Sequence, residues 1–361
     1  MGQFEIKCPT NFSLSFDKLK LIGHQTDPPL RSLIPFRVKR KSGRVVSMIT
    51  SKRLAVALLL IVFLDSSLPA VEVKRPRILG VAHMALFVSD LEKARAFYKD
   101  FLGYDEPYVL KRDDGSDRIA FIKINENQYL ELFAESPKED GRLNHISFLT
   151  DSAEGMRVYL ASRGVKVPDK VSKGRIGNLN FNVVDPDGHI VEIVQYQPDS
   201  WTARERGKFM PDTRISTHIM HIGVLIGALE PAMKFYSEIL GFHEFWRGSS
   251  NGTVLSWVNM RVPDSDDYLE FMLYSEPPNA EQLGVKNHIC LITPDIKKAV
   301  AILEARPARR NYGRPIEIKV GKNGKRQANL FDPDGTRIEL MEPNTVDGKP
   351  VPPSTASPPI K

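Results

Sequence analysis

Cysteine is nearly absent from this chain, which has two cysteines among its 361 residues. Cys8 lies close to the N-terminus and Cys290 lies in an apolar stretch, so the sequence excludes a disulfide framework. We therefore expect an apolar core to stabilise the fold, and a hydrophobic fraction of 42% is typical of a globular protein that can form one.

Long apolar runs are also missing. The run from Leu54 to Leu64 has eleven residues, whereas a membrane-spanning helix needs about 20, so we expect no stable membrane span. Lys52-Arg53 precede this run and Ser66 to Ala70 follow it, which is typical of a secretory signal peptide. We interpret residues 48–70 as such a segment, starting at Met48, and residues 1–47 as a disordered or mis-assigned extension. This predicts an exported protein, periplasmic or secreted; if the run is instead a buried helix, the protein is cytoplasmic.

An excess of acidic residues is absent too, because the formal net charge is +6. Much of the surplus lies in the first 53 residues, and no basic motif interleaved with aromatic residues accompanies it. The sequence therefore predicts no nucleic-acid partner.

An internal repeat dominates the rest of the chain. Gly80 to Tyr104 aligns without a gap with a copy starting at Met220, so that His83 matches His221 at an offset of 138 residues. Each copy has the period 2 of a strand and then the apolar spacing of a helix that ends at a glycine. The Phe97-Tyr98 pair and its copy Phe235-Tyr236 fall on the apolar stripes of their helices, so we predict that both pairs lie in the core.

The repeat continues as four units of the order β-α-β-β-β, which predicts an α+β fold. The last two strands of the second and fourth units flank Asp-Pro-Asp-Gly turns beginning at Asp185 and Asp332. We expect two tandem domains, residues 71–197 and 214–343, joined by a polar linker at 198–213. The tail, residues 344–361, is rich in proline and poor in apolar residues, so we expect it to be disordered. The pattern leaves open whether units pair within a half or across halves.

Each unit carries histidine or glutamate at otherwise apolar strand positions. A buried carboxylate is costly unless it is paired or binds a metal, although a single glutamate could point to solvent and a single histidine could be a core residue. Both halves have histidine, glutamate, histidine and glutamate in the same order at similar spacings. This repetition favours a metal site in each half, for Zn, Ni, Co, Mn or Fe(II). The predicted ligands are His83, Glu131, His145 and Glu192 in the first half, and His221, Glu270, His288 and Glu339 in the second.

From about Ile78 to Pro343 the chain resembles the vicinal oxygen chelate (VOC) superfamily, which includes glyoxalase I, bleomycin-resistance proteins and extradiol dioxygenases. The resemblance is carried by the repeated units, in particular His221, Phe235-Tyr236 and Leu240-Gly241-Phe242. It implies that two βαβββ units form one cupped mixed sheet around a divalent metal, with ligands from the first and last strands.

The resemblance also implies chemistry on a small substrate with neighbouring oxygens, which the metal chelates while it stabilises an enediolate. By the glyoxalase parallel, Glu192 and Glu339 are the candidate catalytic bases, and Glu131 and Glu270 are held as ligands. The parallel favours an enzyme with lyase or isomerase activity, acting as a monomer or homodimer.

At two positions the chain departs from the pattern of glutathione-dependent glyoxalases, which argues against glutathione as a partner. Glutathione-dependent glyoxalases carry arginine four residues after the first ligand, where this chain has Phe87 and Leu225. They carry asparagine four residues after the first glutamate, where Glu135 and Tyr274 stand. We therefore expect an apolar or aromatic substrate portion.

Two alternatives stay open. An Fe(II) extradiol dioxygenase would use His221, His288 and Glu339, but Asn182 and Asn329 stand where that class has tyrosine. A binding or resistance protein would sequester a ligand without turnover. The basic loops at 173–175 and 322–326 could be lids over the sites, although solvated loops are the favoured interpretation.

Overall fold

The computed structural model describes residues 72–137 and 141–360. The proposed extension, residues 1–47, and the signal-peptide-like segment, residues 48–70, lie outside the described residues. No helix in the described part of the chain is long and apolar enough to cross a membrane.

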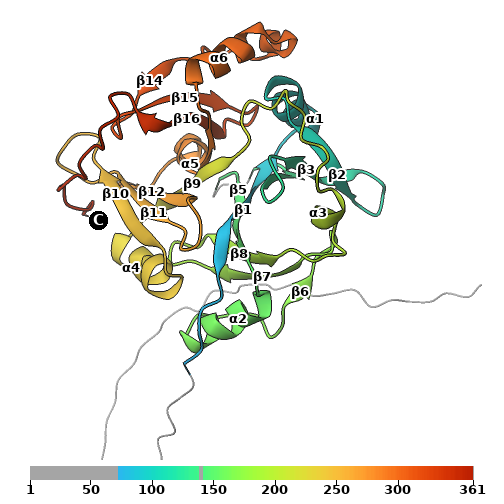
Figure 1. Ribbon diagram of the computed structural model, residues 1–361, viewed down its shortest axis with the longest axis vertical. Coiled ribbons are helices and arrows are strands. Elements are labelled where there is room, and N and C mark those ends of the chain that lie inside the picture. The colour runs from blue at the N-terminus through green and yellow to red at the C-terminus, as the bar shows by residue number, and fades with distance from the viewer. Residues whose placement is uncertain (1–71, 138–140, 361) are drawn as a thin grey trace, which may run out of the picture. The chain divides into compact units, whose positions relative to one another are not determined.

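The first half of the described chain forms one eight-stranded mixed sheet with the strand order β2-β3-β4-β1-β5-β8-β7-β6 (Figure 1). Its first unit contains β1 (Ile78–Val88), α1 (Leu91–Arg95), the π-helix η1 (Ala96–Phe101), β2 (Asp105–Lys111), β3 (Asp117–Lys123) and β4 (Tyr129–Ala134). Its second unit contains β5 (Leu143–Thr150), α2 (Ala153–Ser162), β6 (Ser172–Lys173), β7 (Leu179–Val184) and β8 (Ile190–Gln195).

The second half repeats this arrangement in a second eight-stranded sheet, with the order β10-β11-β12-β9-β13-β16-β15-β14. Its third unit contains β9 (Ile219–Ile226), α4 (Leu229–Met233), the π-helix η2 (Lys234–Ile239), β10 (His243–Gly248), β11 (Trp257–Arg261) and β12 (Tyr268–Leu273). After α5 (Ala280–Lys286), the fourth unit contains β13 (His288–Ile292), α6 (Ile296–Ala305), the 3-10 helix η3 (Pro307–Asn311), β14 (Ile318–Val320), β15 (Lys325–Phe331) and β16 (Arg337–Thr345). The predicted α+β fold with four units is confirmed.

Units pair within each half, which the sequence left undecided. β1 runs parallel to β4 and antiparallel to β5, with Ala85 opposite His145, and β5 runs parallel to β8. The four strands that carry predicted ligands in the first half are therefore neighbours at the centre of one sheet. The second sheet has the same pairing through β12, β9, β13 and β16.

The helix after each first strand packs its apolar stripe as predicted. In the first unit Phe97, Tyr98 and Phe101 are at most 6% exposed, so the helix covers one face of the sheet. Gly103 and Gly241 have φ angles of +82° and +80°, a conformation that glycine adopts without strain, and each ends its helix.

The two halves interlock through reciprocal contacts. The Tyr98 hydroxyl donates to Asp332 in the turn of the other half (3.1 Å), and the Tyr236 hydroxyl donates to Asp185 (2.8 Å). Helices of the two halves also meet: the rings of Phe101 in η1 and Tyr312, which follows η3, are 4.8 Å apart, and the Tyr159 hydroxyl of α2 donates to the carbonyl of Ile239 in η2 (2.7 Å). The tyrosines predicted to be core residues are buried, and they also join the halves.

The linker and the tail both contact the sheets. The linker contains α3 (Trp201–Arg204), and the Trp201 ring lies 5.6 Å from Phe121 and 5.8 Å from Tyr129 between ring centroids. In the tail, where composition predicts disorder, Ser354 N–H donates to the carbonyl of Arg247 (2.9 Å) and Ser357 accepts from Leu255 N–H (2.8 Å). Backbone hydrogen bonds of this kind do not require apolar side chains, which is why composition did not indicate them.

Candidate metal centres

The first centre consists of His83, Glu131, His145 and Glu192, which lie on β1, β4, β5 and β8 and are all at most 8% exposed. The Nε2 atoms of His83 and His145 are 2.9 Å apart. Glu131 oxygens lie 3.7 Å from His83 Nε2 and 3.8 Å from His145 Nε2, and the corresponding distances for Glu192 are 3.5 and 3.9 Å. The structure therefore brings all four predicted ligands of this half together.

Strand alternation explains how a carboxylate comes to lie between core residues. Leu130 and Leu132 of β4 point into the apolar core, so Glu131 between them points to the opposite face, toward the histidines. That face is not solvent here, because the sheet curls and leaves Glu131 only 8% exposed.

The second centre consists of His221, Glu270, His288 and Glu339 on β9, β12, β13 and β16. The two Nε2 atoms are 3.1 Å apart. Glu339 lies 3.4 Å from His221 Nε2 and 3.5 Å from His288 Nε2, whereas Glu270 lies 3.9 and 3.6 Å away. All four predicted ligands of this half are again brought together.

Both centres have the donor geometry for a divalent ion. Two nitrogens bound about 2.1 Å from one ion at a right angle are about 3.0 Å apart, close to the observed Nε2 separations. His83, Glu131 and His145 offer ligand atoms that all lie within 4.8 Å of one another, and so do His221, His288 and Glu339. Each group could hold a divalent metal ion.

Neutral polar side chains support the first centre. Ser147 donates to Glu192 Oε1 (3.0 Å), Asn180 donates to Glu192 Oε2 (3.0 Å), and Asn144 Oδ1 lies 2.8 Å from His145 Nδ1. The contact at Nδ1 leaves His145 Nε2 to face the carboxylates. Glu192 is therefore held in one orientation.

Burial sets the ionisation of the first centre in the absence of a metal. Burial, and then the neighbouring Glu192, raise the pKa of Glu131 well above its ordinary value. Burial raises the pKa of Glu192 to about 7, although the hydrogen bonds from Ser147 and Asn180 oppose this. Burial lowers the pKa of His145 to about 4 and, with His145 nearby, that of His83 well below its usual range. A bound cation would relieve the cost of charging the buried carboxylates.

The second centre has a cation beside it. Arg337 Nη2 lies 2.7 Å from His288 Nδ1 and 2.8 Å from His288 Nε2. Burial and then Arg337 lower the pKa of His288 to about 3. Burial alone would raise the pKa of Glu339, but hydrogen bonds from His221 and His288, and the charge of Arg337, lower it well below its ordinary value.

A cavity of about 160 Å³ opens on the first centre. Glu131, His145 and Glu192 lie in its wall, together with the aromatic rings of Phe121, Tyr129 and Phe133 and the polar residues Arg175, Asn178 and Asn180. Arg175 belongs to a basic loop that the sequence indicated as solvated, yet it contributes to this wall. Phe87 contacts Phe133 at 6.1 Å between centroids, but together with Leu225 it lines a different cavity of about 410 Å³.

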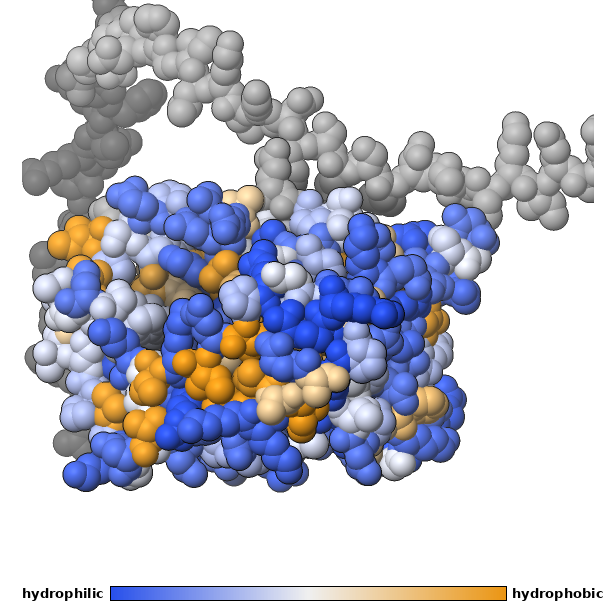
Figure 2. All heavy atoms as spheres, turned by 90° about the horizontal axis from the view of Figure 1, so that it is seen from above, coloured by the Kyte–Doolittle hydropathy of each residue, from blue (hydrophilic) through white to orange (hydrophobic). Residues whose placement is uncertain are grey.

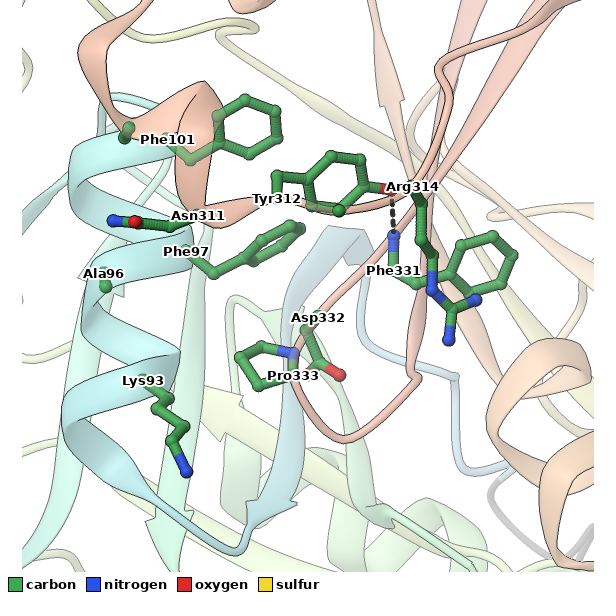
Figure 3. A pocket seen from close by; sticks show the side chains of 12 residues that line it. Lys93, Ala96, Phe97, Phe101, Asn311, Tyr312, Arg314, Phe331, Asp332 and Pro333 are labelled. Atoms are coloured by element: carbon green, nitrogen blue, oxygen red, sulfur yellow. Dashed lines mark hydrogen bonds between the residues drawn. The ribbon is translucent and has the colours of Figure 1, made fainter.

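A wider cleft, of about 460 Å³, lies away from both metal centres, where α1 and η1 face η3 and the β15–β16 turn. Figure 3 shows the rings of Phe97, Phe101 and Tyr312 gathered on one side of it, with the Tyr312 hydroxyl accepting from Phe331 N–H (3.2 Å). None of the eight predicted ligands lines this cleft. On the face drawn in Figure 2, the largest group of hydrophobic residues lies near the centre, and smaller groups lie toward the left and right edges.

Sequence reasoning missed the residues that surround the ligands. Ser147 and Arg337 each lie two positions from a predicted ligand, so period 2 places them on the ligand face of their strands. That spacing was the available signal for both. Asn180 gives no such signal, because it lies twelve residues from Glu192 and meets it only through the pairing of β7 with β8.

The chain matches the sequence model of one protein family in both halves. A sequence model of the Glyoxalase/Bleomycin resistance protein/Dioxygenase superfamily matches residues 80–193 and 218–340. Lactoylglutathione lyase of Schizosaccharomyces pombe is 24% identical over 306 residues, covering 72% of this chain and 95% of the relative.

Solved structures show the same fold. A Mn(II)-bound glyoxalase from Novosphingobium aromaticivorans superposes with a TM-score of 0.55 at 17% identity, covering 78% of this chain and 88% of that one. The anaerobic substrate complex of homoprotocatechuate 2,3-dioxygenase from Brevibacterium fuscum also has a TM-score of 0.55, at 20% identity, covering 81% and 88%. Proteins named as a glyoxalase and as a dioxygenase therefore share this fold.

Proposed function

The chain belongs to the Glyoxalase/Bleomycin resistance protein/Dioxygenase superfamily, and from this premise we propose that its first half is a metal-dependent lyase or isomerase. Its substrate is a small molecule with two neighbouring oxygens. The divalent ion supplies Lewis-acid polarisation of those oxygens when it is bound.

One observation carries this proposal: the first centre has four protein donors, two nitrogens and two carboxylates, on four adjacent strands. With a divalent ion the set has zero net charge. An iron dioxygenase site of the facial type uses two histidines and one carboxylate, so the second carboxylate supports the lyase assignment. Glu131 lies 3.7 and 3.8 Å from the two histidine nitrogens and Glu192 lies 3.5 and 3.9 Å from them, so both carboxylates are placed as donors.

We assign the proton transfer to Glu192. Its oxygens are held by Ser147 and Asn180, so the carboxylate is oriented before the substrate arrives. It lies in the wall of the cavity, where it can take a proton from the carbon next to the substrate oxygens. Tyr129 stacks on His83 at 4.6 Å between centroids and keeps water from that side of the ring.

The cavity wall supports a substrate with an apolar portion. Phe121, Tyr129 and Phe133 supply the apolar surface, while Arg175 supplies a cation. Because Phe87 stands where a glutathione enzyme has arginine, we propose that the substrate is not a glutathione adduct, unlike the substrate that the name of the fission-yeast relative indicates.

The test combines metal content with turnover. Protein purified without chelators is analysed for metals and assayed with aromatic 2-oxoaldehydes, with and without glutathione. We expect bound divalent metal and glutathione-independent conversion to the 2-hydroxy acid, lost on EDTA treatment and restored by Mn²⁺ or Ni²⁺. Metal-free protein that EDTA does not destabilise would instead identify a binding protein.

A second candidate function rests on the second centre. There Glu339 lies 3.4 and 3.5 Å from the two histidine nitrogens, whereas Glu270 lies 3.9 and 3.6 Å from them, so two histidines and one carboxylate form the tighter group. This set suits Fe(II) and ring cleavage of catechols. Oxygen uptake by Fe(II)-loaded protein with catechols tests it, and uptake that Glu339→Gln abolishes would support it.

A further inference from the structure

Residue 337 is the clearest chemical difference between the two centres. Arg337 precedes Glu339 by two residues on β16, and Ile190 precedes Glu192 by two residues on β8. Both therefore lie on the ligand face of their strands, at equivalent positions. One half has a cation there and the other has an aliphatic side chain.

The Arg337 guanidinium lies against a metal-binding atom. Its Nη2 is 2.8 Å from His288 Nε2, the nitrogen that faces Glu339 and Glu270. The other ring nitrogen is engaged by the carbonyl of Lys286, at 2.7 Å from Nδ1. The same Nη2 is 2.7 Å from Nδ1, so the guanidinium lies across the ring and not along one lone pair. A divalent ion bound to Nε2 would therefore lie close to this positive charge, which opposes its binding.

The local backbone places His288 under this cation. His288 lies opposite Gly223 of β9, and a Cβ atom at that glycine would fall 1.9 Å from His288 Cε1. The equivalent position opposite His145 is Ala85, which carries a Cβ. The His288 ring thus occupies space that the first centre does not offer to His145.

The charge of the second centre is also different. Two carboxylates and a divalent ion sum to zero at the first centre, whereas Arg337 leaves the loaded second centre with one positive charge. A small carboxylate anion restores neutrality, and the planar guanidinium binds carboxylates with two parallel hydrogen bonds. Such an anion would draw Arg337 away from His288 Nε2.

We propose that Arg337 makes the second centre a joint site, which binds its divalent ion tightly only together with a small carboxylate that carries a neighbouring oxygen. Ligands of this class are 2-hydroxy and 2-oxo acids. The inference rests on the metal binding in the proposed function, and it assigns different ligands to the two halves.

The test is a Mn²⁺ titration of metal-free full-length protein by calorimetry, with glycolate or glycolamide as probes. Both probes present two neighbouring oxygens, but only glycolate is charged. Without a probe we expect one tight site and a second that is weaker by about tenfold or more. Glycolate should strengthen the second site by about tenfold, and glycolamide should leave it unchanged.

Reciprocal variants identify the residue responsible. Arg337→Ile copies the first half, and we expect two sites of similar affinity that glycolate does not affect. Ile190→Arg copies the second half at a position that is 37% exposed and tolerates a long side chain, and we expect it to weaken the first site and make it respond to glycolate. A glycolate response that persists in Arg337→Ile would overturn the inference.

The remaining outcomes separate this inference from the proposed function. Two equal sites in the unmodified protein, without a glycolate response, would overturn the inference alone. Absence of Mn²⁺ from both centres would overturn the proposed function and this inference with it.

Discussion

The two centres share their four donors but differ in what surrounds them. Ser147 supports Glu192 in the first centre, where the second has Cys290 beside Glu339. Ile190 is replaced by Arg337, and Ala85 by Gly223. The donors give each half the capacity to hold a metal, whereas the neighbouring side chains set the charge and the hydrogen bonds of the centre. Two copies of one fold can therefore serve different ligands.

The largest difference is expected from the two final glutamates. Glu192→Gln keeps the shape of the side chain but removes the proton acceptor, so we expect kcat for lyase turnover to fall by about 10³-fold. Glu339→Gln removes the equivalent group from the centre that we do not assign to this reaction, and we expect a loss below about tenfold. Metal content and kcat are measured for both variants. Equal losses would contradict the assignment of catalysis to the first half.

The two reciprocal tyrosine contacts between the halves should lose similar amounts of stability when either is removed, whereas the two metal centres should differ. Tyr98→Phe and Tyr236→Phe each remove a buried hydrogen bond to a carboxylate of the other half. We expect each to lower the free energy of unfolding by about 2 kcal/mol in denaturant titrations. Tyr159→Phe is the matched control, because its hydroxyl donates to the neutral carbonyl of Ile239 and should contribute about 1 kcal/mol. If one of the two variants loses no more free energy of unfolding than Tyr159→Phe does, the two contacts are not equivalent.

Acidic pH should separate the centres. The pKa of Glu192 is raised to about 7, so protons compete with a metal at the first centre below that pH. Mn²⁺ affinity there should fall by up to about tenfold per pH unit below 7. At the second centre burial raises the pKa of Glu270 but the pKa of Glu339 is lowered, so we expect a smaller fall there. Calorimetric titrations at several pH values measure both sites.

The sign of the effect on stability follows from the same pKa. In the metal-free protein the folded-state pKa of Glu192 lies above its unfolded value. Its contribution to stability is therefore present at low pH and lost as the pH rises through about 7. Glu192→Gln should reduce the change of Tm with pH below about 7. An unchanged dependence of Tm on pH would contradict a raised pKa at Glu192.

The smallest effect is expected from Ser147→Cys, which gives the first centre the residue of the second. The thiol is a weaker donor to Glu192, so we expect Mn²⁺ affinity to change by about fivefold or less, corresponding to about 1 kcal/mol. Cys290→Ser is the reciprocal variant. A loss of metal binding in Ser147→Cys would show that the serine is needed to hold the site, not only to orient Glu192.

Local sequence patterns predicted the units and the ligands because they depend on alternation along single strands. Glu131 and Glu192 each lie between two apolar residues, and that pattern alone places them on the face opposite the core. The repeat then showed that four histidine and glutamate positions belong together in each half. Burial of the predicted tyrosines Tyr98 and Tyr236 followed from helical spacing in the same way.

Contacts between distant segments could not be read from such patterns. Pairing of units within a half depends on the register of β1 with β5, in which Ala85 lies opposite His145 sixty residues later in the chain. The cross-half bond from Tyr98 to Asp332 joins a helix and a turn whose local sequences give no sign of each other. Alternation along β16 places Arg337 on the ligand face, and that could be read from the sequence. Its contact with His288 could not, because it depends on where the His288 ring lies.

The most direct test of the central claim is an anomalous difference map from crystals soaked with Mn²⁺. We expect an ion at the first centre within about 2.0–2.2 Å of His83, His145 and both carboxylates, Glu131 and Glu192. An ion bound by the two histidines and Glu192 alone, with Glu131 turned away, would contradict the four-donor lyase site, and so would a first centre without an ion.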